Sequence, residues 1–171
     1  KWILSLPRGE LKEEAKKYLN DKVETVEEAI QGALDIIAEV ISDDIKYRKF
    51  VKDIIYKSGV IETKVKKKNP DEDKVYEMYY DFEEPISKLA GHRVLALNRG
   101  EKEKILTVKI NAPEEEILSW LKRQVIRTDN PNTTPILEAV VEDSYKRLIA
   151  PAIEREIRND LTEKAEDGSI K

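Results

Sequence analysis

The sequence predicts a mainly α, multihelical, bundle-like fold with at most one short β segment, at about residues 104–110. Two observations carry this prediction. Apolar residues recur at intervals of three and four over several segments, and most of these segments begin or end at a capping residue, a proline or a glycine. No repeat and no low-complexity linker divides the 171 residues. We therefore expect one multihelical unit over 1–171 and, if a sub-boundary exists, we expect it near 128–134.

Caps define the first helices. A short helix is expected over 10–19. Thr25 caps a second helix, with Glu28 at the spacing of a capping box. Its apolar stripe is expected to face a core and consists of Ala29, Ala33, Ile36, Ile37, Val40 and Ile41. Residues 42–44 are expected to supply a new N-cap. A third helix is expected to follow and to end at residues 58–59.

Two alternatives stay open for residues 60–68. Apolar residues and Thr63 alternate with charge as in a strand, whereas the lysines of this segment favour solvent. Asn69-Pro70 predicts the start of a helix that carries tyrosines 76, 79 and 80. Pro85 opens a further helix, which we expect to end at Gly100. Residues 105–110 are the best strand candidate because they are rich in β-branched side chains.

The C-terminal third is predicted to be helical on both sides of a loop. A helix is expected over 113–126, and the polar stretch 128–133 is the clearest loop in the sequence. Thr134-Pro135 starts the longest helical region. Pro151 falls inside its apolar stripe, so the helix should kink or split there.

Composition excludes several classes of protein. Hydrophobic residues make up 40% and charged residues 39%, which favours a folded core over disorder. Without cysteine there can be neither a disulfide nor a thiolate metal site. No apolar run is long enough to cross a bilayer, and we expect a cytoplasmic protein. The chain begins at Lys1, not Met, and is expected to be a piece of a longer protein.

We find no catalytic constellation and expect neither enzymatic activity, nor a cofactor, nor a metal site. His92 is the only histidine, which excludes a site with two histidine ligands. It could serve as a general base beside Glu83 or Glu101. The alternative, which we favour, is a capping or partly buried side chain.

The candidate nucleic-acid contacts are cations. Lys64, Lys66, Lys67, Lys68, Arg93 and Arg99 form this set. Because the net charge is −4, phosphate binding would need a local patch. The lysines are alternatively a solubilising loop, and the nearby tyrosines are expected in a core or interface more than as stacking platforms. One of the two arginines is expected to pair with Glu39 or Glu84, while the other faces outward.

Three strings together resemble a known family. Residues 32–39 are similar to a G-A-x-x-I-L-A-E helix. Residues 92–101 resemble the signature H-R-x-L-A-x-x-R-G-E and follow a Y-x-D-x-x-E-P segment at 79–85. Residues 147–151, with the acidic and basic positions up to 167, are similar to a run that leads into an RNase H-like domain. The family that they resemble is the transcription accessory protein (Tex) family. Its members are the bacterial relatives of a eukaryotic transcription elongation factor.

The resemblance implies a piece from the N-terminal half of such a protein, ahead of its RNase H-like, helix-hairpin-helix and OB-type RNA-binding domains. We therefore expect a non-catalytic scaffold that positions those domains. Contact with RNA or DNA would come through the full-length protein and be weak or absent for this chain. The alternative is a protein-interaction module that docks transcription or translation machinery through Trp2 and the tyrosines 76, 79 and 80.

Overall fold

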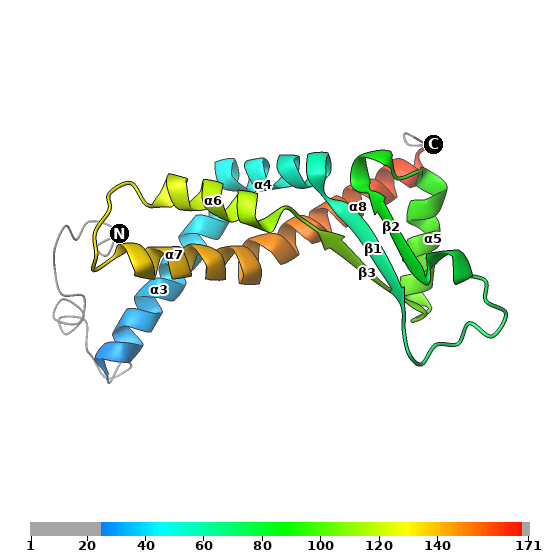
Figure 1. Cartoon of the computed structure of the whole chain (residues 1–171), viewed down its shortest axis with the longest axis horizontal. Coiled ribbons are helices and arrows are strands. Elements are labelled where there is room, and N and C mark those ends of the chain that lie inside the picture. The colour runs from blue at the N-terminus through cyan, green and yellow to red at the C-terminus, as the bar shows by residue number, and fades with distance from the viewer. Residues whose placement is uncertain (1–24, 169–171) are drawn as a thin grey trace. The chain divides into compact units, whose positions relative to one another are not determined.

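The computed structural model describes residues 25–168, which fall into two compact units (Figure 1). Unit 1 comprises residues 25–49 and 115–151, and unit 2 comprises residues 50–114 and 152–168. Helices dominate and a small sheet lies in unit 2, so the predicted fold class, mainly α with a short β component, is confirmed. The 128–134 segment lies inside unit 1. The organisation as a single domain stays a prediction.

Unit 1 is helical. Its elements are α3 (Val26–Asp43), the start of α4 (Ile45–Ser58), α6 (Glu114–Val125), α7 (Thr134–Asp143) and the π-helical segment η4 (Ser144–Ile149). As predicted, Thr25 caps α3, since its hydroxyl accepts a hydrogen bond from the Glu28 amide at 3.1 Å. α3 packs against α7 and η4. There, buried Ser144 donates to the carbonyl of Ala38 at 2.6 Å.

The expected core stripe of α3 is wrong at two positions. Ile36 and Val40 are 61% and 64% exposed, whereas Ile37 and Ile41 are buried. Successive residues of a helix point about 100° apart, so the row through 36 and 40 lies beside the row through 37 and 41. The neighbouring elements of the described chain cover only the second row. Apolar residues at helical spacing alone could not distinguish the two.

The last helical region changes its form just before Pro151 but continues through it without a break. The regular helix α7 gives way to η4, and α8 (Ala150–Glu166) follows. The amide of Ala150 donates to the carbonyl of Tyr145, five residues back. Pro151 itself has no N–H, and its ring would crowd the carbonyl four residues earlier in a regular helix. The wider π turn directly before the proline accommodates both effects.

Unit 2 is built on a three-stranded antiparallel sheet with the order β2-β1-β3. The strands are β1 (Val60–Val65), β2 (Asp81–Pro85) and β3 (Leu106–Asn111), and helix α5 (Gly91–Lys102) packs on β3 (Figure 1). The strand alternative for residues 60–68 is thus correct. β1 buries Ile61 and Thr63 and leaves Lys64 exposed. The strand predicted at 105–110 corresponds to β3.

The helix predicted to start at Asn69-Pro70 is wrong. The segment forms turns, a single 3-10 turn η2 (Glu77–Tyr79) and then β2. The carboxylate of Asp71 accepts hydrogen bonds from the amides of Val75 and Tyr76, both at 2.9 Å, and thereby competes with helical bonding. The helix expected from Pro85 is preceded by the 3-10 turn η3 (Ile86–Lys88), starts only at Gly91 and runs past Gly100.

Two further predictions concern residues 1–24 and the membrane. The short helix at 10–19 and Trp2 lie outside the described residues. Within residues 25–168, no helix combines the length and the apolar character that a membrane span requires.

Candidate nucleic-acid interface

The predicted basic segment begins on β1 and continues into the loop after it. Lys64 forms ion pairs with Asp81, across the sheet on β2, and with Glu62 on its own strand. The hydrogen bond with Asp81 raises the pKa of the Lys64 ammonium. Lys66 is half-buried and its amide donates to the carbonyl of Ile105 at 2.8 Å. Lys67 and Lys68 are exposed. Lys66 is thus the lysine of this segment that is not exposed, and Lys64 is exposed but paired with carboxylates.

Arg93 is held by its own unit. Its guanidinium carbon lies 5.3 Å from the centre of the Phe82 ring, and its Nη1 is 3.9 Å from Oε2 of Glu84. Both charged side chains are half-buried. No hydrogen-bond donor of the described chain reaches the buried Oε2 of Glu84, so Arg93 supplies its compensating charge. The expectation that one arginine pairs with Glu84 is confirmed.

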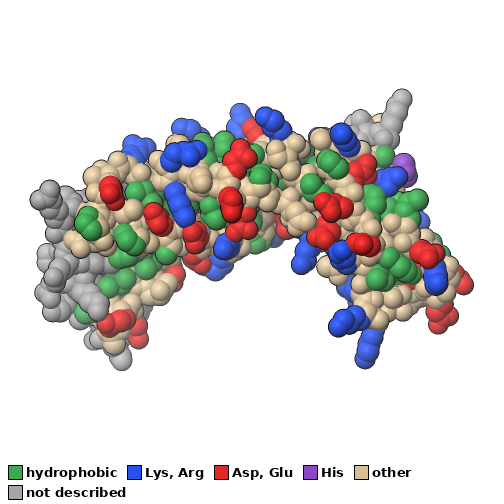
Figure 2. All heavy atoms as spheres, viewed as in Figure 1, with side chains coloured by type: hydrophobic (Ala, Val, Ile, Leu, Met, Phe, Trp, Pro, Cys, Tyr) green, Lys and Arg blue, Asp and Glu red, His purple; other side chains and the backbone are tan. Residues whose placement is uncertain are grey.

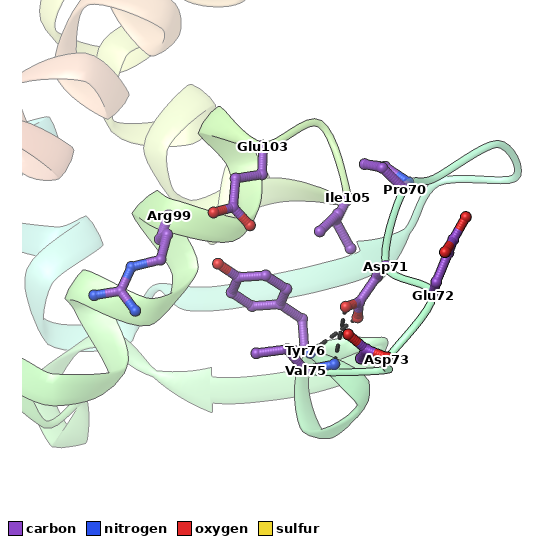
Figure 3. Close-up of a pocket in the computed structure, with 9 residues that line it drawn as sticks. All are labelled: Pro70, Asp71, Glu72, Asp73, Val75, Tyr76, Arg99, Glu103 and Ile105. Atoms are coloured by element: carbon purple, nitrogen blue, oxygen red, sulfur yellow. Dashed lines mark hydrogen bonds between the residues drawn. The ribbon is translucent and has the colours of Figure 1, made fainter.

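Arg99 lies on the same helix and is exposed, as expected for the second arginine. It lines an open pocket of about 630 Å³ in unit 2. Residues 70–76, except Lys74, form one wall of the pocket, and Arg99, Glu103 and Ile105 form the other (Figure 3). The ring of Tyr76 extends from the first wall toward Glu103 (Figure 3). Burial is the largest cause, and the hydrogen bond with Glu103 the next, that raise the pKa of Tyr76 to about 12.

The electrostatics of this pocket do not suit a phosphate. Among its lining residues, Asp71, Glu72, Asp73 and Glu103 carry carboxylates, whereas Arg99 is the single cation. Such a lining repels a polyanion. Figure 2 shows the same mixing more widely, because blue and red side chains are interspersed over the visible face. No broad positive patch is visible on that face.

The tyrosines serve the core of unit 2. Tyr76 and Tyr79 are buried. The Tyr79 ring meets that of Phe82 edge-on at 5.2 Å. Tyr80 donates its hydroxyl proton to Asp71 at 2.7 Å, and this bond raises the pKa of Tyr80 to about 12. Tyr76 and Tyr79 therefore lie in the core, one of the two expected roles, and their burial argues against an interaction face formed by all three tyrosines.

His92 lies in the first turn of α5 and is exposed, so the expectation of a capping or partly buried histidine is wrong; Ala90 occupies the cap position. The carboxylate of Glu101, one of its expected partners, is engaged with Arg158 at 2.8 Å. Within residues 25–168 no group of three or more histidine, aspartate or glutamate side chains is arranged to hold a metal ion.

Sequence reasoning missed the residues that order this unit. Asp71 lies where a helix was predicted but instead anchors a loop. Lys52 pairs with Asp160 at 2.9 Å, and Tyr56 donates to the same carboxylate at 3.1 Å. The hydrogen bond from Lys52 lowers the pKa of Asp160 despite partial burial. Asp160 lies more than 100 residues further along the chain than Lys52 and Tyr56. No local sequence pattern predicts such contacts.

Comparisons with known proteins agree on one relationship. A family model described as "Tex central region-like" matches residues 7–171. The "Uncharacterized protein YdcI" of Bacillus subtilis is 49% identical over 99% of the chain. The human "S1 RNA-binding domain-containing protein 1" is 31% identical over 85%, and the "Transcriptional accessory protein Tex" of Neisseria gonorrhoeae is 27% identical over 80%. The chain spans 24%, 16% and 15% of these curated relatives, respectively.

Proposed function

The chain belongs to the Tex central region-like family, and on that premise we propose that it is a non-catalytic helical scaffold of a cytoplasmic transcription accessory protein. In this role it positions nucleic-acid-binding domains that lie elsewhere in the longer protein. The relatives named for transcription and for an S1 RNA-binding domain support the assignment, and the chain corresponds to less than a quarter of each. RNA or DNA is therefore proposed as a partner of the whole protein.

The observation that carries the proposal is the engagement of the candidate phosphate-binding cations. Lys64 is paired with Asp81, and Arg93 with Glu84 and the Phe82 ring. A phosphate would have to displace these carboxylates, so such cations contribute little counterion release. Lys67, Lys68 and Arg99 are exposed members of the predicted set, and Lys64 is exposed as well but paired with Asp81 and Glu62. We expect such a set to support only weak, salt-dependent contact.

A titration by fluorescence anisotropy tests the proposal. The chain and the longer protein are each titrated against labelled single-stranded RNA and DNA at low and at moderate salt. We expect tight binding for the longer protein and weak binding for the chain, with a shallow dependence of log K on log salt. Tight, sequence-specific binding by the chain alone would overturn the scaffold assignment.

A charge-matched pair of variants sharpens the test. Lys66→Gln, Lys67→Gln and Lys68→Gln together remove the loop cations. Lys46→Gln, Lys49→Gln and Lys57→Gln remove three exposed lysines of α4. If the residual binding is non-specific, both triple variants weaken it to a similar extent. A loss confined to the loop variant, with a change in the preferred sequence, would identify a direct recognition element.

A protein-interaction module is the second candidate function. It is favoured by large apolar side chains that the described chain leaves exposed, among them Ile36 and Val40 on α3. Exposed apolar pairs on one helix face are typical of surfaces that contact another protein. Capture of a defined partner by the chain, lost in an Ile36→Ser and Val40→Ser variant, would support this function.

A further inference from the structure

The loop of residues 70–78 in unit 2 is held in one conformation by side-chain hydrogen bonds. The side chain of Asn69 accepts a bond from the Asp71 amide at 3.0 Å, and Asp71 in turn binds the amides of Val75 and Tyr76. Lys74, which lies between Asp71 and Val75 in the sequence, has a backbone φ of 53°, a conformation that a lysine seldom adopts. The buried Asp71 therefore determines which side chains the loop presents outward.

The loop presents apolar side chains to solvent. Val75 and Met78 are 71% and 66% exposed, on either side of the buried Tyr76. Single exposed apolar residues are common on protein surfaces. Val75, however, lines the open pocket of about 630 Å³ described above. An apolar contact point thus lies beside a preformed hollow.

Carboxylates surround this apolar contact point. Glu72 and Asp73 are exposed on the same loop, and Glu103, directly after the end of α5, lines the pocket with its carboxylate turned toward the Tyr76 hydroxyl (Figure 3). Arg99 is exposed and lines the pocket. The carboxylates of the lining attract cations and repel phosphates. The guanidinium of Arg99 can donate hydrogen bonds to backbone carbonyls.

We propose that this pocket binds a cationic peptide segment of a partner protein. An apolar side chain of the segment packs on Val75, lysines or arginines lie beside Glu72 and Asp73, and Arg99 donates to a peptide carbonyl. An RNA strand has the wrong charge for the lining, and an acidic peptide is excluded for the same reason. The inference does not depend on the scaffold function, because it concerns a different partner, and Arg99 is the residue that the pocket shares with the candidate nucleic-acid contacts.

The probe is a short amidated peptide of alternating arginine and leucine, titrated into the full chain with amide resonances as the readout. We expect shifts confined to residues around Val75, Tyr76 and Arg99. A double variant, Glu72→Gln with Asp73→Asn, should bind about tenfold more weakly. Val75→Ser should weaken binding about fivefold. Both sets of side chains are exposed, so the variants should fold, and the amide spectrum verifies that they do.

Matched controls separate the pocket from general attraction. Glu115→Gln with Glu116→Gln removes the same charge from the surface of α6, and Ile45→Ser removes another exposed apolar side chain. Both should bind the probe as the unchanged chain does. The proposal is overturned if these controls weaken binding equally. It also fails if a peptide with glutamate in place of arginine binds as well, or if single-stranded RNA shifts the same resonances.

Discussion

The guanidinium of Arg158 on α8 donates to Glu101 on α5, with 2.8 Å between Nη2 and Oε1, and the same nitrogen donates to Asn98 at 2.9 Å. Asn98 in turn donates to Thr162, one turn further along α8, at 2.8 Å. The Arg158 side chain is only 19% exposed, so solvent screens this bridge less than a surface pair. Within unit 2 these contacts dock the C-terminal part of α8 on α5.

Arg158→Ala should therefore destabilise the chain. The variant leaves Glu101 and Asn98 without their shared donor, and we expect the free energy of unfolding to fall by about 1–2 kcal/mol. Urea denaturation followed by far-UV circular dichroism measures the change. Arg155→Ala, at an exposed position of the same helix, should stay within about 0.5 kcal/mol. Equal losses in both variants would mean that the bridge contributes nothing.

Gly100→Ala and Gly32→Ala should have opposite effects. A Cβ at Gly100 would lie 2.9 Å from Cγ of Leu106 and 3.3 Å from Cδ1 of Tyr76, whereas a Cβ at Gly32 would meet no atom within 4 Å. Overpacking at the first site should cost about 1–3 kcal/mol. Alanine at the second site should stabilise α3 by about 0.5–1 kcal/mol. Thermal unfolding of the two variants side by side checks the sign of each change.

Two adjacent isoleucines of α3 give a test of the corrected stripe. Ile37 is buried and Ile36 is largely exposed. Ile37→Ala should lower the free energy of unfolding by about 2–5 kcal/mol, while Ile36→Ala should change it by about 0.5 kcal/mol or less. Chemical denaturation gives both values. A large loss at Ile36 would show that this face is covered in solution.

Local signals predicted the elements whose bonds are local. Thr25 and Glu28 fixed the start of α3, since a capping bond spans three residues. Pro151 indicated the place where the last helical region changes its form, because a missing N–H acts on its own turn. The alternation in residues 60–65 was compatible with a strand. Pairing with residues 81–85 and 106–111, which lie further along the chain, makes this segment the strand β1.

Long-range partners explain what the sequence did not reveal. The segment after Asn69 has the caps of a helix, yet Asp71 takes up amides that a helix would use and binds Tyr80 nine residues on. The pairing of Arg93 with Glu84 was foreseen as one of two alternatives. Arg158 and Glu101 both lie in strings that resemble the family, but their contact spans 57 residues and needs the fold.

The acid sensitivity of the loop provides the last prediction. Burial opposes ionisation of Asp71, but the hydrogen bonds from Tyr80, Tyr76 and Val75 outweigh it and lower the pKa of Asp71 below its ordinary value of 3.8. A carboxyl with a lowered pKa in the folded state stabilises that state above its unfolded pKa. This stabilisation is lost as the pH falls through the lowered pKa.

Asp71→Asn should therefore be less stable than the unchanged chain near neutral pH, and the two should converge in acid. Urea denaturation of both proteins from about pH 7 down to about pH 3 measures the difference, and subtraction removes the carboxylates that both share. Asp73→Asn is the matched control, because the Asp73 carboxylate accepts none of the loop hydrogen bonds formed by Asp71. A difference between Asp71→Asn and the unchanged chain that stays constant with pH would show that the ionised form of Asp71 does not order the loop.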